Sequence, residues 1–336
     1  MNRRALLATM FVGATGMIAG NLEAAVSQER AVSVTVSGVE VACRLTMPQG
    51  THRGAVLLVP GSLYSDVDGN YPSMNMRPHA YADLARQLGE RGFTVLRMAK
   101  IGPGTGSRTV DADAARRHND FLTRIEVARA GLDLLRRVGS RRPVIVAGHS
   151  EGAVVASLLA AGSAAAGIDG VVSLSGPALP ILSILRAQVA AMVPPGTTPD
   201  MTMFDRTVAA IRAGEAPSPD AKANPQTNML ASMPQQGLAY LRSADRVDPV
   251  VALAKVKVPV LIVQGGRDDS VPASHAAMLR AGRANLPTEV AIFPNLTHFY
   301  KIALPGLLPM QSMALETQSD PAVTDAITAW AGGLGG

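Results

Sequence analysis

Apolar residues follow two patterns along this chain, alternating near the N-terminus and continuous further on. Alternation through 31–36 and 39–47, with Ser37-Gly38 between them, predicts an antiparallel hairpin. Residues 54–59 form an unbroken apolar run, as expected of a strand that helices cover on both faces. Further short runs predict strands at 94–98, 143–147, 170–174, 259–264 and 289–293.

Helical spacing of apolar residues lies between these runs. It predicts helices at 78–91, 119–138 and 321–331, and another that starts directly after Gly152. Strands that alternate with helices form βαβ units. The predicted fold class is therefore α/β, with a mostly parallel central sheet flanked by helices.

The alternation stops over 176–253, where helices are predicted at 179–192, 203–213 and 235–242. We expect a helical lid over the carboxyl ends of the strands, where α/β sheets bind ligands. The alternative is an insertion without a role in the site. The core then comprises 26–175 and 254–336. Several lid residues favour an apolar ligand, although packing between helices accounts for most of them: Leu182, Ile184, Leu185, Val189, Met192 and Met201.

Residues 1–25 have the features of a signal peptide. Asn2-Arg3-Arg4 is a positively charged start, Ala5 to Gly20 is apolar, and small residues follow in Asn21 to Val26. The apolar stretch is short and interrupted by glycine, so we expect removal rather than a stable membrane anchor. Export to a bacterial periplasm or beyond is predicted, and the arginine pair is compatible with the twin-arginine route.

Charge and cysteine content exclude several classes of protein. The net charge of +5 is spread along the chain without a cluster of Lys and Arg, so no nucleic-acid-binding face is predicted. Cys43 is the single cysteine, and no internal disulfide can form. It shares one face of an alternating strand with Val41 and Leu45, which predicts a small buried hydrophobe.

The strongest chemical signal is Gly148-His149-Ser150-Glu151-Gly152, a G-x-S-x-G sequence between a β-branched run and a helix of small residues. In this strand–turn–helix arrangement the serine lies on a strained turn, with its Oγ exposed near the positive end of the helix. Glycine at both ends removes Cβ atoms that would collide. Ser150 is therefore the predicted nucleophile.

A serine hydroxyl needs a base, and the base needs an orienting acid. In this arrangement the acid and then the histidine follow the serine along the chain. Asp268 and Asp269 follow the strand at 259–264, with Asp268 the first choice and Asp269 the alternative. His298 follows the strand at 289–293 and is the predicted base.

Acyl transfer develops negative charge on the carbonyl oxygen, which preset N–H donors stabilise. The amide of Glu151, directly after the nucleophile, is one predicted donor, and the amide of Ser62, after the strand at 54–59, is the other, with Leu63 behind it. Leu63, Tyr64 and His149 are predicted to contact the substrate.

Two further motifs do not indicate a ligand. Asp66 to Asn70 resembles the start of a calcium loop, but Arg77 stands where the closing Glu is required. Gly102 to Gly106 lacks the Lys-Ser/Thr ending of a phosphate-binding loop and is expected at the rim of the site. No metal site and no cofactor is predicted.

On these motifs the chain resembles the α/β-hydrolase superfamily, and more narrowly bacterial esterases of the serine-aminopeptidase-like or prolyl-oligopeptidase-like group. The third-strand loop of that group reads like G-S-G-P-x-D-R-D-G-N, which matches the stretch from Gly61 to Asn70, and the elbow matches as well. Asp248-Pro249 resembles the turn that leads out of the lid in that group. The resemblance implies an α/β-hydrolase fold with a helical lid.

The chain departs from that group at two places. Leu63-Tyr64 replaces the usual Gly-Pro, which reshapes the oxyanion region. After the next strand that group usually has R-Y-D-K-R-G. The corresponding stretch here, from Arg97 to Gly102, reads R-M-A-K-I-G, so two charged residues near the site are missing.

The sequence thus predicts a serine hydrolase, most directly a carboxylesterase for small to medium apolar esters. Two alternatives stay open. One is an aminopeptidase or amide hydrolase on the same triad, in which Glu151 holds a substrate amine. The other is a non-catalytic binding protein on a hydrolase scaffold. The expected partner is a small-molecule ester, and the oligomeric state is open.

Overall fold

The computed structural model describes residues 28–117, 120–138, 142–192 and 198–335 of the chain. The predicted signal peptide, 1–25, lies outside the described residues and stays a prediction.

One sheet organises the described chain, in the order β1-β2-β4-β3-β6-β7-β8-β9 with the short β5 paired to β2. The first two strands form the predicted hairpin, β2 runs antiparallel to β4, and the neighbours from β4 to β9 are parallel. The strands are β1 (Gln28–Val36), β2 (Val39–Met47), β3 (Gly54–Val59), β4 (Phe93–Met98), β5 (Arg108–Thr109), β6 (Val144–His149), β7 (Gly170–Leu174), β8 (Val260–Gly265) and β9 (Thr288–Phe293).

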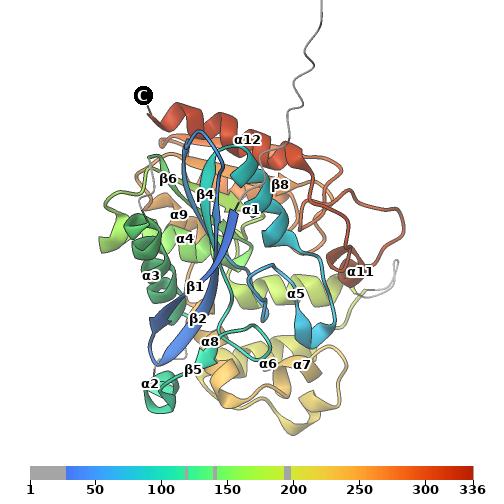
Figure 1. The fold of residues 1–336 in the computed structure, drawn as a ribbon. Helices are drawn as coiled ribbons and strands as arrows, with labels where there is room; N and C mark the ends of the chain where they lie inside the picture. The colour runs from blue at the N-terminus through green and yellow to red at the C-terminus, as the bar shows by residue number, and fades with distance from the viewer. Residues whose placement is uncertain (1–27, 118–119, 139–141, 193–197, 336) are drawn as a thin grey trace, which may run out of the picture.

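Helices cover both faces of the sheet, which explains the continuous apolar runs. In β3, Leu57 and Val59 pack with side chains of α3 and α4, whereas Val56 and Leu58 pack with those of α1 and α12. Figure 1 shows α3 and α4 on the opposite side of the sheet from α1 and α12. The helices around the sheet are α1 (Ala80–Glu90), α2 (Ala112–Arg117), α3 (Thr123–Arg137), α4 (Glu151–Ala161), α9 (Pro249–Ala254), α10 (Ser274–Ala281), α11 (Pro309–Met313) and α12 (Pro321–Gly332).

The predicted elements are present, with differences at their ends. The helix expected from residue 119 begins at Thr123, because Asp120 Oδ1 accepts hydrogen bonds from the amide and the hydroxyl of Thr123 and holds the preceding chain in a turn. The elements that the sequence pattern did not predict are all short: β5, α2, α7 (Asn228–Ala231), α9, α10 and α11.

The segment after β7 forms a separate helical cluster at one end of the sheet (Figure 1). It contains α5 (Ile181–Ala191), α6 (Thr202–Ala213), α7 (Asn228–Ala231) and α8 (Gln235–Asp245). Leu182, Met201 and Phe204 lie in its own apolar core. Leu253 of α9 instead packs into the main core beside α4. The helical insertion therefore ends near residue 245, earlier than the expected 253.

The side chain of Cys43, in β2, is buried, as predicted. Burial raises the pKa of its thiol to about 12, so the side chain stays a neutral hydrophobe at physiological pH.

The register of the parallel strands brings the candidate residues to one edge of the sheet. Val59 pairs with Gly148, His149 with Leu174, and Gly265 with Phe293. The loops that follow β3, β6, β8 and β9 therefore leave the sheet at the same edge.

Candidate active site

Ser150 lies on a tight turn between β6 and α4. Its backbone has φ 53° and ψ −126°, a conformation that costs a non-glycine residue energy. A Cβ at position 148 would lie 2.1 Å from the carbonyl oxygen of Gly152, and one at 152 would lie 2.4 Å from that of Val59. The two glycines therefore let strand and helix approach closely enough to hold the half-buried serine at the sheet edge.

Asp268 and His298 form the polar pair of the site. His298 Nδ1 lies 2.8 Å from Asp268 Oδ2, and both side chains are buried. The other carboxylate oxygen, Oδ1, accepts from the amides of Ser270 and Val271 at 2.9 and 2.8 Å. Asp269 is exposed. Of the two candidate acids, the structure brings Asp268 to the histidine.

The carboxylate of Asp268 is held in its charged form. Burial alone would raise its pKa, but the charge of His298 and the hydrogen bonds from His298 and the Val271 amide outweigh burial and leave the pKa below its ordinary value. An ionised acid at this position can orient the imidazole and stabilise its protonated form.

His298 lies beside the elbow. Its ring packs against the ring of His149, with 4.5 Å between centroids, and His149 directly precedes Ser150. Within the described residues, Ser150 Oγ and His298 Nε2 form no hydrogen bond with each other. Such bonds are often long before substrate binds and tighten in the complex.

His149 is buried in the site. Like Ser150 and His298 it does not line the cavity described below, and its contact with the substrate stays a prediction. Its Nε2 lies 3.0 Å from the carbonyl oxygen of His298, and its Nδ1 lies 3.2 Å from the hydroxyl of Tyr81. A carbonyl only accepts, so Nε2 carries the proton and Nδ1 accepts from Tyr81.

The Tyr81 hydroxyl also accepts from the amide of Gly61 at 2.8 Å. This chain of bonds joins the loop after β3 to the loop that carries His298. Burial, followed by the neighbouring charge of His298, lowers the pKa of His149 to about 3, so its ring is neutral.

The predicted oxyanion donors lie beside the nucleophile. A Cβ at Gly61 would approach the Cβ of Ser150 to 3.1 Å, so the chain after β3 passes directly over the elbow. Neither the amide of Ser62 nor that of Glu151 donates to an acceptor in the described part of the chain. Both residues line the cavity. Two N–H groups at this place, without an acceptor among the described residues, fit the predicted role of oxyanion donors.

A cavity of about 430 Å³ opens between the sheet edge and the helical insertion. The predicted substrate contacts Leu63 and Tyr64 line it and are partly exposed. Leu63 has φ 61°, a left-handed conformation that suits the Gly for which it substitutes. Of the apolar insertion residues proposed for substrate binding, only Leu185 lines the cavity, whereas Leu182 and Met201 are buried within the insertion.

A buried cluster of charges lies in the wall of this cavity and was not predicted. Glu151 Oε2 lies 2.5 Å from Arg124 Nη1 and 3.3 Å from Lys100 Nζ. The Tyr240 hydroxyl, from α8, lies 3.1 Å from both carboxylate oxygens. Burial would raise the pKa of Glu151, but the two cations outweigh it and keep the pKa low. The position of Lys100 just after the end of β4 was the one signal available in the sequence.

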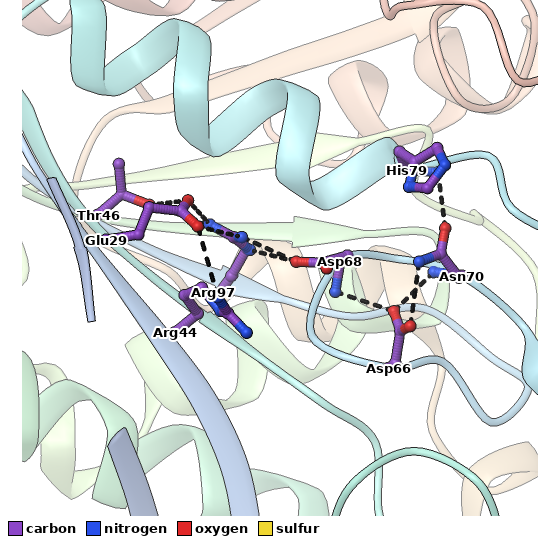
Figure 2. Close-up of polar contacts among 8 residues, drawn as sticks. All are labelled: Glu29, Arg44, Thr46, Asp66, Asp68, Asn70, His79 and Arg97. Atoms are coloured by element: carbon purple, nitrogen blue, oxygen red, sulfur yellow. Dashed lines mark hydrogen bonds and ion pairs between the residues drawn. The ribbon is translucent and has the colours of Figure 1, made fainter. Parts of the chain in front are cut away.

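Figure 2 shows how the loop that resembles a calcium site is held. Asp66 Oδ1 accepts from the amides of Asp68 and Asn70, so its carboxylate closes the loop on itself. Asp68 in turn binds the buried Arg97 at 2.8 Å, and Arg97 also binds Glu29. No group of three or more potential metal-ligating side chains is found in the described ranges.

The chain was compared with known proteins. Residues 56–307 match the model of a family described as the alpha/beta hydrolase family. A search of curated proteins finds no match. Among the described residues, no helix is long and apolar enough to cross a bilayer.

Several solved esterases have a similar fold. Est1E from Butyrivibrio proteoclasticus superimposes with a TM-score of 0.56 at 17% identity, over 90% of this chain and 98% of that one. The esterase domain of a Rhodothermus marinus protein gives 0.52 at 17% identity over 90% and 98%. The Pyrococcus furiosus esterase PF2001 gives 0.52 at 14% identity over 81% and 84%. At these identities the likeness establishes the fold.

Proposed function

The chain belongs to the α/β-hydrolase family, and from that premise we propose that it is a serine carboxylesterase with Ser150 as its nucleophile. The observation that carries the proposal is the 2.8 Å contact between His298 and Asp268 at the sheet edge where Ser150 sits. An ionised acid, an oriented imidazole and a serine on a strained elbow are the parts that acyl transfer needs.

The reaction has two halves. Ser150 Oγ attacks the ester carbonyl while Nε2 of His298 takes the hydroxyl proton, and the amides of Ser62 and Glu151 stabilise the oxyanion. The bond between the carbonyl carbon and the alcohol oxygen then breaks, and His298 gives its proton to the leaving alcohol. Water next attacks the acyl-enzyme and loses a proton to His298, which returns it to Ser150 as the acid departs.

The arrangement of charges supports an ester over an aminoacyl substrate. An aminopeptidase needs a free carboxylate for the substrate amine, but Glu151 is already bound to Arg124, Lys100 and Tyr240. The two cations around that carboxylate would repel a substrate ammonium. The other carboxylate in the cavity wall, Asp120, accepts hydrogen bonds from the amide and the hydroxyl of Thr123. The cavity wall is mainly apolar, which supports an acyl group with an apolar section.

Turnover assays test the proposal. We expect hydrolysis of p-nitrophenyl esters of graded acyl length, little turnover of aminoacyl anilides, and loss of ester turnover by at least about a thousandfold in Ser150→Ala. Labelling by a fluorophosphonate in the wild type but not in Ser150→Ala separates a hydrolase from a binding protein. Ester turnover that persists in Ser150→Ala would refute the mechanism.

We also propose that the protein is exported from a bacterial cell. The charged start and apolar stretch within residues 1–25 support this proposal. Cell fractionation of the tagged full chain, beside a chain that begins at residue 26, tests it. Equal retention of both proteins in the cytoplasm would contradict export.

A further inference from the structure

Lys100, in the cavity wall, carries an ammonium with more N–H donors than hydrogen-bond partners in the part of the chain that the structure describes. Its side chain is only 11% exposed, and its ammonium lies 3.3 Å from Glu151 Oε2 and 5.0 Å from the centre of the Tyr240 ring. An ammonium has three N–H donors, and in the described chain Glu151 is the one hydrogen-bond acceptor of Lys100 Nζ. Lys100 belongs to the wall of a cavity whose lining is mainly apolar.

Glu151 does not depend on Lys100 for its charge partner. Arg124 binds the carboxylate at the shorter distance of 2.5 Å, and Tyr240 donates to it as well. The three charges that contact one another, on Lys100, Arg124 and Glu151, sum to +1. Asp120 is the fourth charged residue of the cavity wall and brings the wall as a whole to zero, but it is only half-buried, caps the first turn of α3 through Oδ1 and forms no ion pair with the two cations.

A buried positive charge in apolar surroundings favours an anionic partner. A neutral hydrogen-bond acceptor would leave the excess charge uncompensated, whereas a carboxylate would neutralise it through a charge-assisted bond. The site therefore suits a ligand that carries a carboxylate.

The position of the cavity indicates which part of an ester enters it. Ser62 and Glu151, the predicted oxyanion donors, line the cavity, but neither Ser150 nor His298 does. The leaving alcohol must lie at His298, because this residue protonates it. The cavity on the other side of the carbonyl is left for the acyl part.

We propose that Lys100 binds a carboxylate at the far end of the acyl part, so that the preferred substrates are monoesters of dicarboxylic acids with an apolar spacer. This inference rests on the proposed esterase function and specifies its substrate class. Arg124 and Glu151 are positioning residues that hold the ammonium at the cavity wall.

The titration of Lys100 gives the inference a second test, the pH dependence of the carboxylate preference. Burial lowers its pKa to about 8, Arg124 acts in the same direction, and Glu151 opposes them. Tyr240, the other titratable group in contact, has a pKa raised by burial and stays neutral in this range. The carboxylate preference should therefore be complete near pH 7 and fade as the pH rises through about 8.

Matched substrates test the inference. The 4-nitrophenyl monoesters of adipic and suberic acid are compared with the same molecules methylated at the far carboxyl, so that each pair differs in the charge and in one methyl group. We expect the ratio of kcat/KM for acid over methyl ester to exceed about ten in the wild type and to fall by about ten- to a hundredfold in Lys100→Met. The exposed Lys257→Met is the control, in which the ratio stays at the wild-type value.

The ratio within one preparation cancels changes in the triad and in the active fraction. Should Lys100→Met not fold, Lys100→Gln keeps the chain length and removes the charge, and the wild-type pH profile needs no variant. A wild-type ratio near one, or a ratio that Lys100→Gln leaves intact, or one that is constant from pH 7 to 9.5, overturns the inference while the esterase function stands. Absence of turnover of every ester by the folded wild type instead refutes the proposed function and the inference with it.

Discussion

A single side chain, His149, ties two walls of the site together. Its two ring nitrogens bond to the Tyr81 hydroxyl and to the backbone of His298, and Tyr81 in turn accepts from Gly61. The elbow motif leaves this position open to many residues. Here it sets the spacing between the loop of the oxyanion donors and the loop of the base.

His149→Phe tests this positioning role. Phenylalanine keeps the ring packing but loses both hydrogen bonds, so we expect kcat for p-nitrophenyl butyrate to fall about tenfold or more, with a smaller change in KM, because misplaced groups affect the transition state most. His52→Phe, far along the chain from the elbow, is the control. An unchanged kcat would remove the role assigned to His149.

At the residue scale, residue type and order along the chain predicted which side chains the fold brings to one edge of the sheet. Ser150 lies on the turn after β6 and His298 contacts Asp268, while their catalytic roles stay predictions. The choice between Asp268 and Asp269 was left open, because neighbouring residues of a loop can face opposite ways and only the folded loop decides. The hydrogen bonds of His149 to Tyr81 and to His298 could not be predicted, because both partners lie far away in the chain.

At the scale of elements, a buried arginine joins strand β1 to the loop before α1 (Figure 2). Arg97 is 2% exposed and binds Glu29 and Asp68. The carbonyl of Asp68 accepts from the amides of Tyr81 and Ala82, at the start of α1. Arg97 therefore steadies the helix that supplies the Tyr81 hydroxyl to the site.

We expect Arg97→Met to lower the free energy of unfolding by about 3 kcal/mol, because it leaves two carboxylates without their buried partner. Arg44→Met is the matched control: Arg44 also approaches Glu29, at 3.8 Å, but is 37% exposed, so its loss should cost less than about 1 kcal/mol. Urea unfolding of both variants measures the difference. Equal effects would show that burial of Arg97 has no special weight.

The elements themselves were largely predictable, because hydrophobic periodicity is local. Residues 54–59 and 259–264 had to be covered on both faces, and they are. The cluster of Lys100, Arg124, Glu151 and Tyr240 was not predictable, because its members come from four separate parts of the chain. The sequence left open that Glu151 binds a substrate amine, because its bonds to Arg124 and Lys100 form only in the folded chain.

At the scale of the whole molecule, the stability of the fold should depend on pH in the acid range. His149 is neutral in the folded protein, with its pKa lowered from 6.5 to about 3 by burial first and then by the charge of His298. Between these values the unfolded chain binds a proton that the folded chain does not. Stability therefore falls as the pH drops below about 6.5.

Urea unfolding between pH 7.5 and 4 measures this dependence. We expect a loss of up to about 1.4 kcal/mol per pH unit from His149, with a smaller contribution from His275, whose pKa burial also lowers. His149→Gln should reduce the slope. The lowered pKa values of Asp268 and Glu151 contribute stability that is lost only at lower pH, below their ordinary values of 3.8 and 4.5. A slope in His149→Gln equal to that of the wild type would contradict this assignment.

Tyr240 belongs to the helical insertion, yet its hydroxyl bonds to the residue that directly follows Ser150. An outward displacement of α8 would withdraw these bonds from the carboxylate of Glu151, whose backbone amide is a proposed oxyanion donor. Opening of the insertion at α8 would thus change both the access to the cavity and the surroundings of the residue that follows the nucleophile.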